Sequence, residues 1–277
     1  MKLRVHLAQF YPKLGNIEYN MEKHIEISGR AKDKADLLIF PELSLTGSNL
    51  MDLVSEVALE KNSKILNPLL EFSSNLDIIF GLVELGENNL FYDSAFYCSK
   101  SSLKYVHRKS FLSSPRRSGG KDYFSSGNNT GVLNADWGKL GFIISDDALN
   151  PVSVLPFIQK NPDIIIIIDN GLSFGFSSDT GIPKSALMWK NLISLYAQIF
   201  CSYVIYVNRV GFEDGLNFFG GSSVIDPYGE TIISCPYFEE SSLDVELDLQ
   251  IFKSRPFNLS FNRERLESIL RNLKDEI

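Results

Sequence analysis

The sequence predicts one α/β domain over residues 1–277, folded as a four-layer αββα sandwich with two mixed β-sheets face to face and helices outside. Three observations support this. Hydrophobic residues make up 44% and charged residues 22%, as in ordinary globular proteins. The strand-like runs are too many for one ordinary sheet. The run Ile164–Ile168 contains no polar residue, so both of its faces must be covered.

The elements follow one another along the chain in a mixed order. Strand-like runs, recognised by apolar residues between turn residues, lie at 3–9, 36–40, 77–83, 94–98, 103–109, 139–145, 163–169, 203–208, 222–226 and 231–234. Helical patterns lie at 18–34, 52–74, 151–159, 184–200 and 262–276. Strands and helices alternate early, whereas direct strand-to-strand turns appear in the middle and late in the chain. No repeat or linker divides the sequence, which indicates a single domain.

Charge and cysteine content narrow the class of partner and the compartment. The net charge of −7 and the pI near 5.1 argue against general nucleic-acid binding. The N-terminal residues lack an apolar signal core, and the longest aliphatic run is far below the ~20 residues that span a bilayer. Cys98, Cys201 and Cys235 are odd in number and widely spaced, which is typical of reduced thiols. We therefore expect a cytoplasmic protein without nucleic-acid or membrane partners.

Three predicted strands end in side chains that can carry chemistry. DLLIFPE ends at Glu42, LKYVHRK ends at Lys109, and KLGFIIS ends at Ser145. Open α/β sheets place ligands beyond the carboxyl ends of their strands. A carboxylate, an amine and a hydroxyl are therefore expected to converge on one pocket.

The segments around these residues resemble a known family. FPELSLTG (40–47), HRKSFL (107–112), GFIISDDALNP (141–151) and NRVGFEDGLNFFGGSSVIDPYGE (208–230) are similar to successive motifs of the nitrilase, or carbon–nitrogen hydrolase, superfamily. The resemblance spans nearly the whole chain, and the first and last segments most resemble the glutamine-amidase domains attached to NAD synthetases. It implies that Glu42 is the general base and that Lys109 stabilises the oxyanion.

The sequence departs from the family pattern at two places. The family nucleophile lies in G-x-x-I-C-E/D-D, and here Ser145 stands where the cysteine is expected, before Asp146 and Asp147. An alcohol is far less acidic than a thiol, so the change disables a nucleophile that relies on a neighbouring carboxylate. The second departure is Gly120, which aligns with a family glutamate, and residues 118–121 contain no acid.

Two functional hypotheses follow from these departures. The leading one is a catalytically impaired or inactive amidohydrolase homologue, a pseudoenzyme that binds a small amide or carboxylate. The alternative is an active amidase or glutaminase whose cysteine was substituted by Ser145.

Further pocket residues are suggested by position. Asp146, Ser173 and Asn208 are candidate substrate-binding residues. Asn208, Gly220 and Gly221 resemble family positions that line or support the pocket, although glycines there could equally reflect tight backbone packing. Asp147 is better explained as a group that satisfies backbone N–H groups near a helix start. The basic residues within 107–121 are either a charged surface loop or a guide for an anionic ligand.

One motif would indicate a different enzyme class, but the residues around it do not fit that class. Gly171–Gly175 matches the G-x-S-x-G elbow of serine esterases. An elbow must open a helix and needs a histidine downstream. A turn-rich segment follows instead, and His6, His24 and His107 all lie upstream.

No metal or organic cofactor is implied, because the histidines and cysteines show no ligand spacing. The family resemblance likewise implies chemistry by side chains alone. It also implies a homodimer or higher oligomer formed through helices that flank the site.

Overall fold

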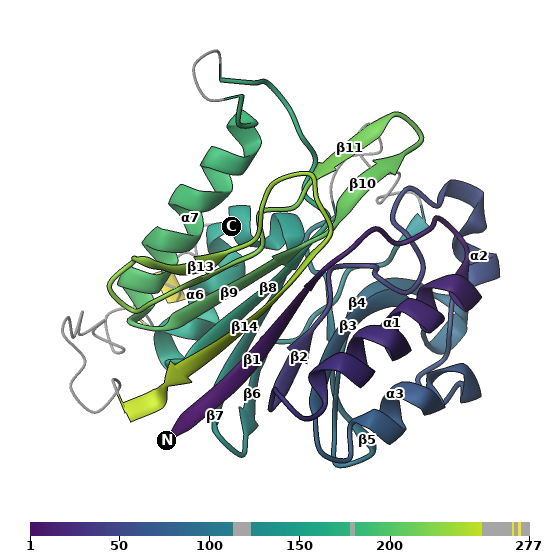
Figure 1. Cartoon of the computed structure of the whole chain (residues 1–277), viewed down its shortest axis with the longest axis horizontal. Helices are drawn as coiled ribbons and strands as arrows, with labels where there is room; N and C mark the ends of the chain where they lie inside the picture. Colours follow the sequence, from purple (N-terminus) through teal and green to yellow (C-terminus); the bar gives the residue numbers. More distant parts are fainter. Residues whose placement is uncertain (113–122, 178–180, 251–267, 269–270, 273–277) are drawn as a thin grey trace.

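The computed structural model describes residues 1–112, 123–177, 181–250, 268, 271 and 272. Two six-stranded sheets pack face to face, and helices cover their outer faces (Figure 1). The predicted αββα sandwich is therefore confirmed.

The first sheet is mixed. Its strands β1, β2 and β3 are parallel, whereas the other neighbours pair antiparallel. In sheet order the strands are β14 (Ser241–Asp248), β1 (Lys2–Gln9), β2 (Leu37–Ile39), β3 (Asp77–Leu85), β4 (Phe91–Ser99) and β5 (Ser102–Arg108).

The second sheet has a similar plan, with β7, β8 and β9 parallel at its centre. In sheet order its strands are β13 (Thr231–Ser234), β12 (Ser223–Ile225), β9 (Tyr203–Asn208), β8 (Ile164–Asp169), β7 (Gly138–Ile144) and β6 (Val132–Ala135). A separate hairpin joins β10 (Val210–Glu213) to β11 (Leu216–Phe219).

Among the described residues, four helices form the outer layers. α1 (Ile17–Ala31) and α3 (Asn67–Phe72) pack on the first sheet, while α6 (Pro151–Lys160) and α7 (Lys184–Phe200) pack on the second (Figure 1). Shorter helical turns are η1 (Met51–Leu53), α2 (Val54–Val57), η2 (Lys64–Leu66), η3 (Glu87–Asn89) and η4 (Ser145–Leu149). In the described part of the chain, no helix is long and apolar enough to cross a membrane.

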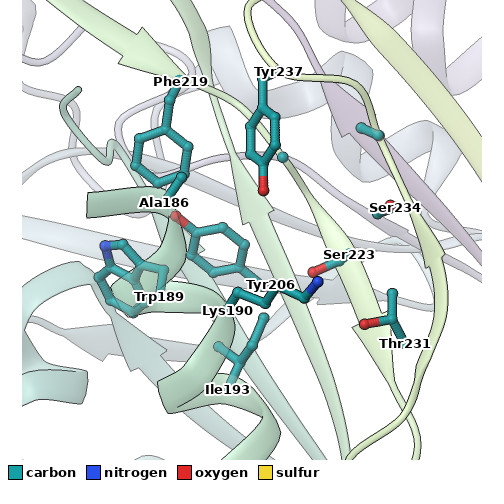
Figure 2. Close-up of a pocket in the computed structure, with 12 residues that line it drawn as sticks. Ala186, Trp189, Lys190, Ile193, Tyr206, Phe219, Ser223, Thr231, Ser234 and Tyr237 are labelled. Atoms are coloured by element: carbon teal, nitrogen blue, oxygen red, sulfur yellow. The ribbon is translucent and has the colours of Figure 1, made fainter. Parts of the chain in front are cut away.

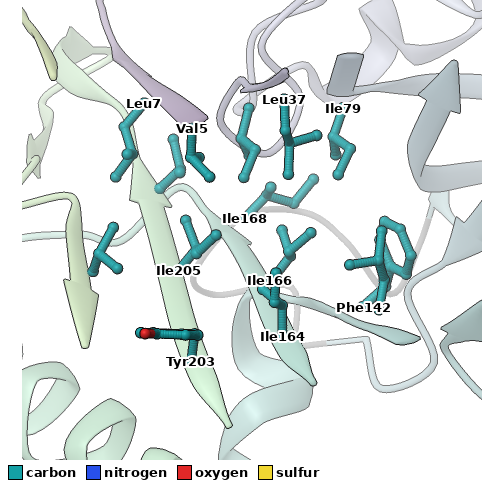
Figure 3. Close-up of a cluster of buried hydrophobic side chains, with 14 of the residues drawn as sticks. Val5, Leu7, Leu37, Ile79, Phe142, Ile164, Ile166, Ile168, Tyr203 and Ile205 are labelled. Carbon is teal, nitrogen blue, oxygen red and sulfur yellow. The ribbon is translucent and has the colours of Figure 1, made fainter. Parts of the chain in front are cut away.

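Strand β8 shows why the sandwich forms. Ile164, Ile166 and Ile168 point into the layer between the sheets, where they meet side chains such as Val5 and Leu37 (Figure 3). The alternate residues of β8 pack against α6 and α7 instead. Burying each isoleucine contributes roughly 1.5–3 kcal/mol. A strand that is apolar on both faces is therefore stable only between two covering layers.

The helix predicted at 52–74 is wrong. The segment forms α2, η2 and α3, separated by an extended stretch in which Leu59 makes a parallel bridge to Glu84 at the end of β3. Leu59 is buried and exchanges backbone hydrogen bonds with Val83 and Leu85. This pairing with a distant strand overrides the local helical pattern.

Other boundaries follow the predictions more closely. The helix predicted at 184–200 is α7 with the same bounds. Four of the described strands were not predicted, namely the short strands β6, β10 and β11 and the longer β14, which places acidic residues on its exposed face. The helix predicted at 262–276 lies almost wholly outside the described residues.

Candidate active site

The predicted reactive residues meet at one edge of the sandwich. Glu42 follows β2 and Lys109 follows β5, both in the first sheet. Ser145 follows β7 in the second sheet. All three strands end at the same edge, since β5 is antiparallel to β4, which is antiparallel to β3.

An ion pair forms the half of the site that the first sheet carries. The Nζ atom of Lys109 lies 2.7 Å from Oε1 of Glu42 and 3.7 Å from Oδ2 of Asp93. The other Glu42 oxygen, Oε2, accepts a hydrogen bond of 2.9 Å from the backbone N–H of Asn170. Both oxygens of Glu42 are therefore engaged.

Burial makes this pair strongly coupled. Burial alone lowers the pKa of Lys109, but the Glu42 and Asp93 carboxylates outweigh it and raise the pKa above its usual value. Burial, followed by repulsion from Glu42, raises the pKa of Asp93 well above its usual range. Lys109 is thus a fixed cation at neutral pH, and Asp93 binds a proton more readily than an exposed aspartate does.

The turn that carries Glu42 rests directly on β3. A side chain at Gly81 would place its Cβ 2.3 Å from the backbone nitrogen of Leu43 and 2.8 Å from the carbonyl oxygen of Pro41. The backbone of Gly81 in turn accepts a hydrogen bond from the N–H of Leu45. Only glycine leaves room for this approach.

A hydroxyl and a carboxylate form the half that the second sheet carries. Ser145 Oγ donates a hydrogen bond of 2.7 Å to Oδ1 of Asp169, and the hydroxyl of Tyr206 donates one of 2.6 Å to Oδ2. Asp169 is 0% exposed. Ser145 has a φ of 47°, an unusual backbone conformation for a residue with a side chain, at the turn from β7 into η4. Strained residues of this kind cluster at functional sites.

Two carboxylates near Ser145 bind protons more readily than usual. Burial, followed by repulsion from Glu42, raises the pKa of Asp169 to about 7. Burial raises the pKa of Asp147 to about 6, although two backbone N–H groups oppose it.

Asp147 joins the two halves of the site. Its carboxylate accepts hydrogen bonds from the N–H groups of Ser110 and Phe111, at 2.8 and 2.7 Å. It therefore does satisfy backbone groups, but those beside Lys109 rather than those of a helix start. The N-cap of α6 is Asn150.

A small cavity of about 60 Å³ opens over Ser145. Its lining combines charged, polar and apolar groups, which are Lys109, Ser145, Asp146, Leu149, Asp169, Asn170, Gly171, Leu172, Phe174, Met188 and Trp189. Its size suits only a short ligand segment.

A second cavity of about 130 Å³ lies between α7 and the strands β12 and β13. Figure 2 shows the aromatic rings of Trp189, Tyr206, Phe219 and Tyr237 around it. Trp189 lines both cavities and stacks on Tyr206, with ring centroids 5.2 Å apart. These two rings therefore form a wall behind the site.

The predicted substrate-binding residues take different positions. Asp146 lines the cavity over Ser145. Ser173 lies in the loop between β8 and α7, where its backbone N–H donates to Asn217, and it is absent from the cavity lining. The Asn208 side chain accepts from the N–H of Gly171 and donates to the carbonyl of Gly220. Asn208 thus supports the pocket loop from behind.

Sequence reasoning missed Asp93, Asp169 and Tyr206. Asp169 was identified only as the end of a strand. Its place beside Ser145 follows from the register of β7 and β8, which pair in parallel with Ile144 opposite Ile168, and no residue pattern in the sequence reveals that register.

The basic segment 107–121 is described only in part. His107 is buried, Arg108 pairs with Glu84 at 2.6 Å, and Lys109 pairs with Glu42. These three residues therefore do not form a charged surface loop, and that part of the prediction is wrong. Gly120 and the other basic residues lie outside the described residues.

Among the residues that the structure describes, no group of three or more His, Cys, Asp or Glu is arranged to hold a metal ion.

Known proteins resemble this chain over most of its length. The carbon-nitrogen hydrolase family model matches residues 4–256. The chain is 33% identical over 252 residues to a glutamine-dependent NAD(+) synthetase of Thermotoga maritima, covering 90% of this chain and 42% of that protein. It is 26% identical over 283 residues to a probable nitrilase of Schizosaccharomyces pombe, covering 99% of each. The solved structure of glutamine-dependent NAD+ synthetase from Acinetobacter baumannii matches with a TM-score of 0.78 at 30% identity, covering 90% of this chain and 46% of that chain. The chain therefore spans less than half the length of these two synthetases.

Proposed function

The chain belongs to the carbon-nitrogen hydrolase family, and on this premise we propose that its pocket binds a small amide or carboxylate but hydrolyses amides slowly or not at all. One observation carries the proposal. The Ser145 hydroxyl donates its hydrogen bond to Asp169, while both Glu42 oxygens are engaged by Lys109 and by the backbone of Asn170.

This arrangement weakens amide hydrolysis for a physical reason. A serine hydroxyl must lose its proton as it attacks, and it needs a base within hydrogen-bond reach. Glu42 is the base that the family resemblance implies, but its two oxygens are engaged by Lys109 and by the Asn170 backbone, and the Ser145 hydroxyl donates to Asp169 instead. An amide also expels an amine only after that nitrogen has gained a proton.

The cavity supports a small polar ligand. Lys109, Asp146 and Asn170 offer charged and amide groups, whereas Leu149 and Met188 offer apolar walls. Pockets of this kind fix a ligand by a few polar groups and bury its carbon atoms.

The alternative function is an active amidase or glutaminase. It is favoured by the Glu42–Lys109 pair, which is intact, and by the similarity of the chain to a probable nitrilase and to glutamine-dependent NAD(+) synthetases. A natural or engineered replacement of cysteine at position 145 would fit this alternative equally.

An ammonia-release assay with glutamine, asparagine and simple amides separates the two functions. We expect no turnover above the blank, together with saturable binding of acetamide or acetate in calorimetry. Turnover that Ser145→Ala abolishes would overturn the proposal. Ser145→Ala is a suitable control because it removes the hydroxyl while leaving the ion pair untouched.

Ser145→Cys tests the alternative more directly. We expect the restored sulfur to release little ammonia, because residues 118–121 lack the acid that the family resemblance calls for. Rapid turnover by this variant would mean that the hydroxyl alone limits the enzyme.

We also propose a cytoplasmic location and pairing of two copies through α7. The exposed side chains of Leu187, Met188 and Leu195 form one apolar stripe along this helix beside the site. Light scattering tests the pairing, and Leu195→Glu is expected to convert a dimer to a monomer. A monomeric wild type would overturn it.

A further inference from the structure

We infer that Ser145 and Asp169 form a nucleophile–base pair that accepts an acyl group from a short carboxylic ester. This inference rests on the proposed function in placing the ligand over Ser145. It goes beyond that function by assigning a reaction, and by assigning Asp169 a role that neither the motifs nor the family resemblance supplied.

The geometry already has the required contact. Ser145 Oγ lies 2.7 Å from Asp169 Oδ1, within the distance over which a general base takes a proton. Both residues line the same cavity, so an ester carbonyl held there reaches the hydroxyl. The positive φ of Ser145 holds its side chain at the sharp turn between β7 and η4.

Asp169 is better suited than Glu42 to act as the base. Glu42 faces a buried cation at 2.7 Å, whereas both oxygens of Asp169 accept from hydroxyl groups. A raised pKa near 7 makes the Asp169 carboxylate a stronger proton acceptor than an ordinary aspartate at neutral pH. The other titratable groups around it are Glu42, Asp146, Tyr206 and Lys109.

Folding alone gives no reason for this arrangement. A carboxylate that is 0% exposed and repelled by Glu42 costs stability, and an apolar residue at the end of β8 would avoid that cost. Costly buried carboxylates of this kind are concentrated at functional sites.

Acyl transfer to Ser145 and hydrolysis of the acyl-serine are two successive steps. Ser145 Oγ forms a bond to the carbonyl carbon while its proton passes to Asp169, and the carbonyl oxygen gains negative charge that the Lys109 cation stabilises. The bond from carbon to the leaving oxygen then breaks. That oxygen receives the proton from Asp169, or it leaves as a stable anion and Asp169 passes the proton to solvent, so that the Asp169 carboxylate is restored in either case. Water next attacks the acyl-serine, Asp169 takes the water proton, and Ser145 Oγ regains it as the carboxylic acid departs.

The leaving group explains why esters differ from amides here. An aryl or alkyl oxide departs from the tetrahedral intermediate far more readily than an amine does. The Ser145–Asp169 pair can therefore be acylated by esters even when ammonia release from amides is negligible.

The test uses p-nitrophenyl acetate with the full chain. We expect a burst of p-nitrophenolate and an acetyl group on the peptide that contains Ser145, identified by mass spectrometry. Asp169→Asn is expected to slow acylation by about 100-fold or more. The matched control is Asp77→Asn, since Asp77 also accepts from a tyrosine hydroxyl, that of Tyr97, but lies at the opposite edge of the first sheet.

A pH profile separates a base from a structural role. The wild-type acylation rate is expected to rise with pH around a midpoint near 7, and this rise is lost in Asp169→Asn. Tyr206→Phe keeps the carboxylate but removes one of its donors, so the midpoint should move to higher pH. This variant keeps the inference testable if Asp169→Asn fails to fold.

Several outcomes would overturn the inference. They are an absence of acetylation, an acetyl group on Ser173 or another residue, or wild-type rates in Asp169→Asn. Each leaves acetamide binding and the ammonia assay unaffected. Ammonia release would overturn the proposed function without removing the acetyl-serine.

Discussion

Each sheet contributes one half of the site, and the carboxylates Glu42 and Asp169 have different partners in the two halves. In the first half, Glu42 forms an ion pair with the cation of Lys109. In the second half, Asp169 faces the hydroxyls of Ser145 and Tyr206, and its proton is held more tightly than usual. Glu42 and Lys109, which match the family pattern, lie in the first half, and Ser145, which departs from it, lies in the second.

The difference suggests how a change at one position can be accommodated. Ser145 differs from the expected cysteine, and its hydrogen bond goes to a carboxylate from the adjacent strand of the same sheet. The charged pair across the cavity remains engaged with itself and with the Asn170 backbone. If the two halves differ in this way, substitutions in them should change the free energy of unfolding and its pH dependence by different amounts.

The largest effect is expected from Lys109→Met. Removing the cation leaves Glu42 buried without its partner, which should lower the free energy of unfolding by about 3–5 kcal/mol. Urea denaturation measures this loss. Lys2→Met breaks a surface pair with Glu246 and should leave the midpoint nearly unchanged. Equal urea midpoints for Lys109→Met and Lys2→Met would show that the Lys109–Glu42 ion pair does not stabilise the first half of the site.

The second effect is a pH dependence of stability that Asp169 causes. Its pKa is about 7 in the folded chain and near 3.8 when unfolded, so the folded state binds the extra proton between these values. Stability should therefore fall as pH rises from about 4 to 7, by on the order of 3 kcal/mol.

Asp169→Asn should flatten this slope in denaturation curves recorded across the pH range. It will not remove the slope completely, because Asp147, with a pKa of about 6, contributes in the same direction. A slope as steep as that of the wild type would contradict a tightly held proton on Asp169.

The smallest effect is expected from Tyr206→Phe. Loss of the hydroxyl removes one of the two hydrogen bonds from side-chain hydroxyls to Asp169, which should cost about 1–2 kcal/mol at pH 8. Tyr203→Phe is the matched control on the same strand, since its hydroxyl contacts a backbone carbonyl at 3.3 Å. If Tyr203→Phe lowers the free energy of unfolding as much as Tyr206→Phe does, the hydrogen bond to the Asp169 carboxylate is no stronger than one to a backbone carbonyl.

Much of the fold was predictable because its signals are local. Helix α7 has clear helical periodicity, and β8 is apolar on both faces, so both were predicted from residue patterns alone. The structure of segment 52–74 was not predicted correctly. The backbone hydrogen bonds that Leu59 forms at the end of β3 stabilise an extended conformation there more than a continuous helix would.

The site was predictable to the same degree and for the same reason. Glu42, Lys109 and Ser145 each end a recognisable strand, so their convergence followed from the sheet architecture. Asp169 ends a strand too, but its chemical meaning depends on the register between β7 and β8, which no residue pattern reveals. Asp93 lies near the start of β4, at an edge that only antiparallel pairing brings to the pocket.

Gly81 shows that the placement of the charged pair depends on a residue that supplies no functional group. Any side chain there would meet the main chain of Pro41 and Leu43, on either side of Glu42. Substitution would push the turn off β3 and carry the carboxylate with it. Position 81 should therefore tolerate substitution as poorly as Glu42 and Lys109 do. The cause at position 81 is lack of space, whereas at Glu42 and Lys109 it is the loss of a charged group.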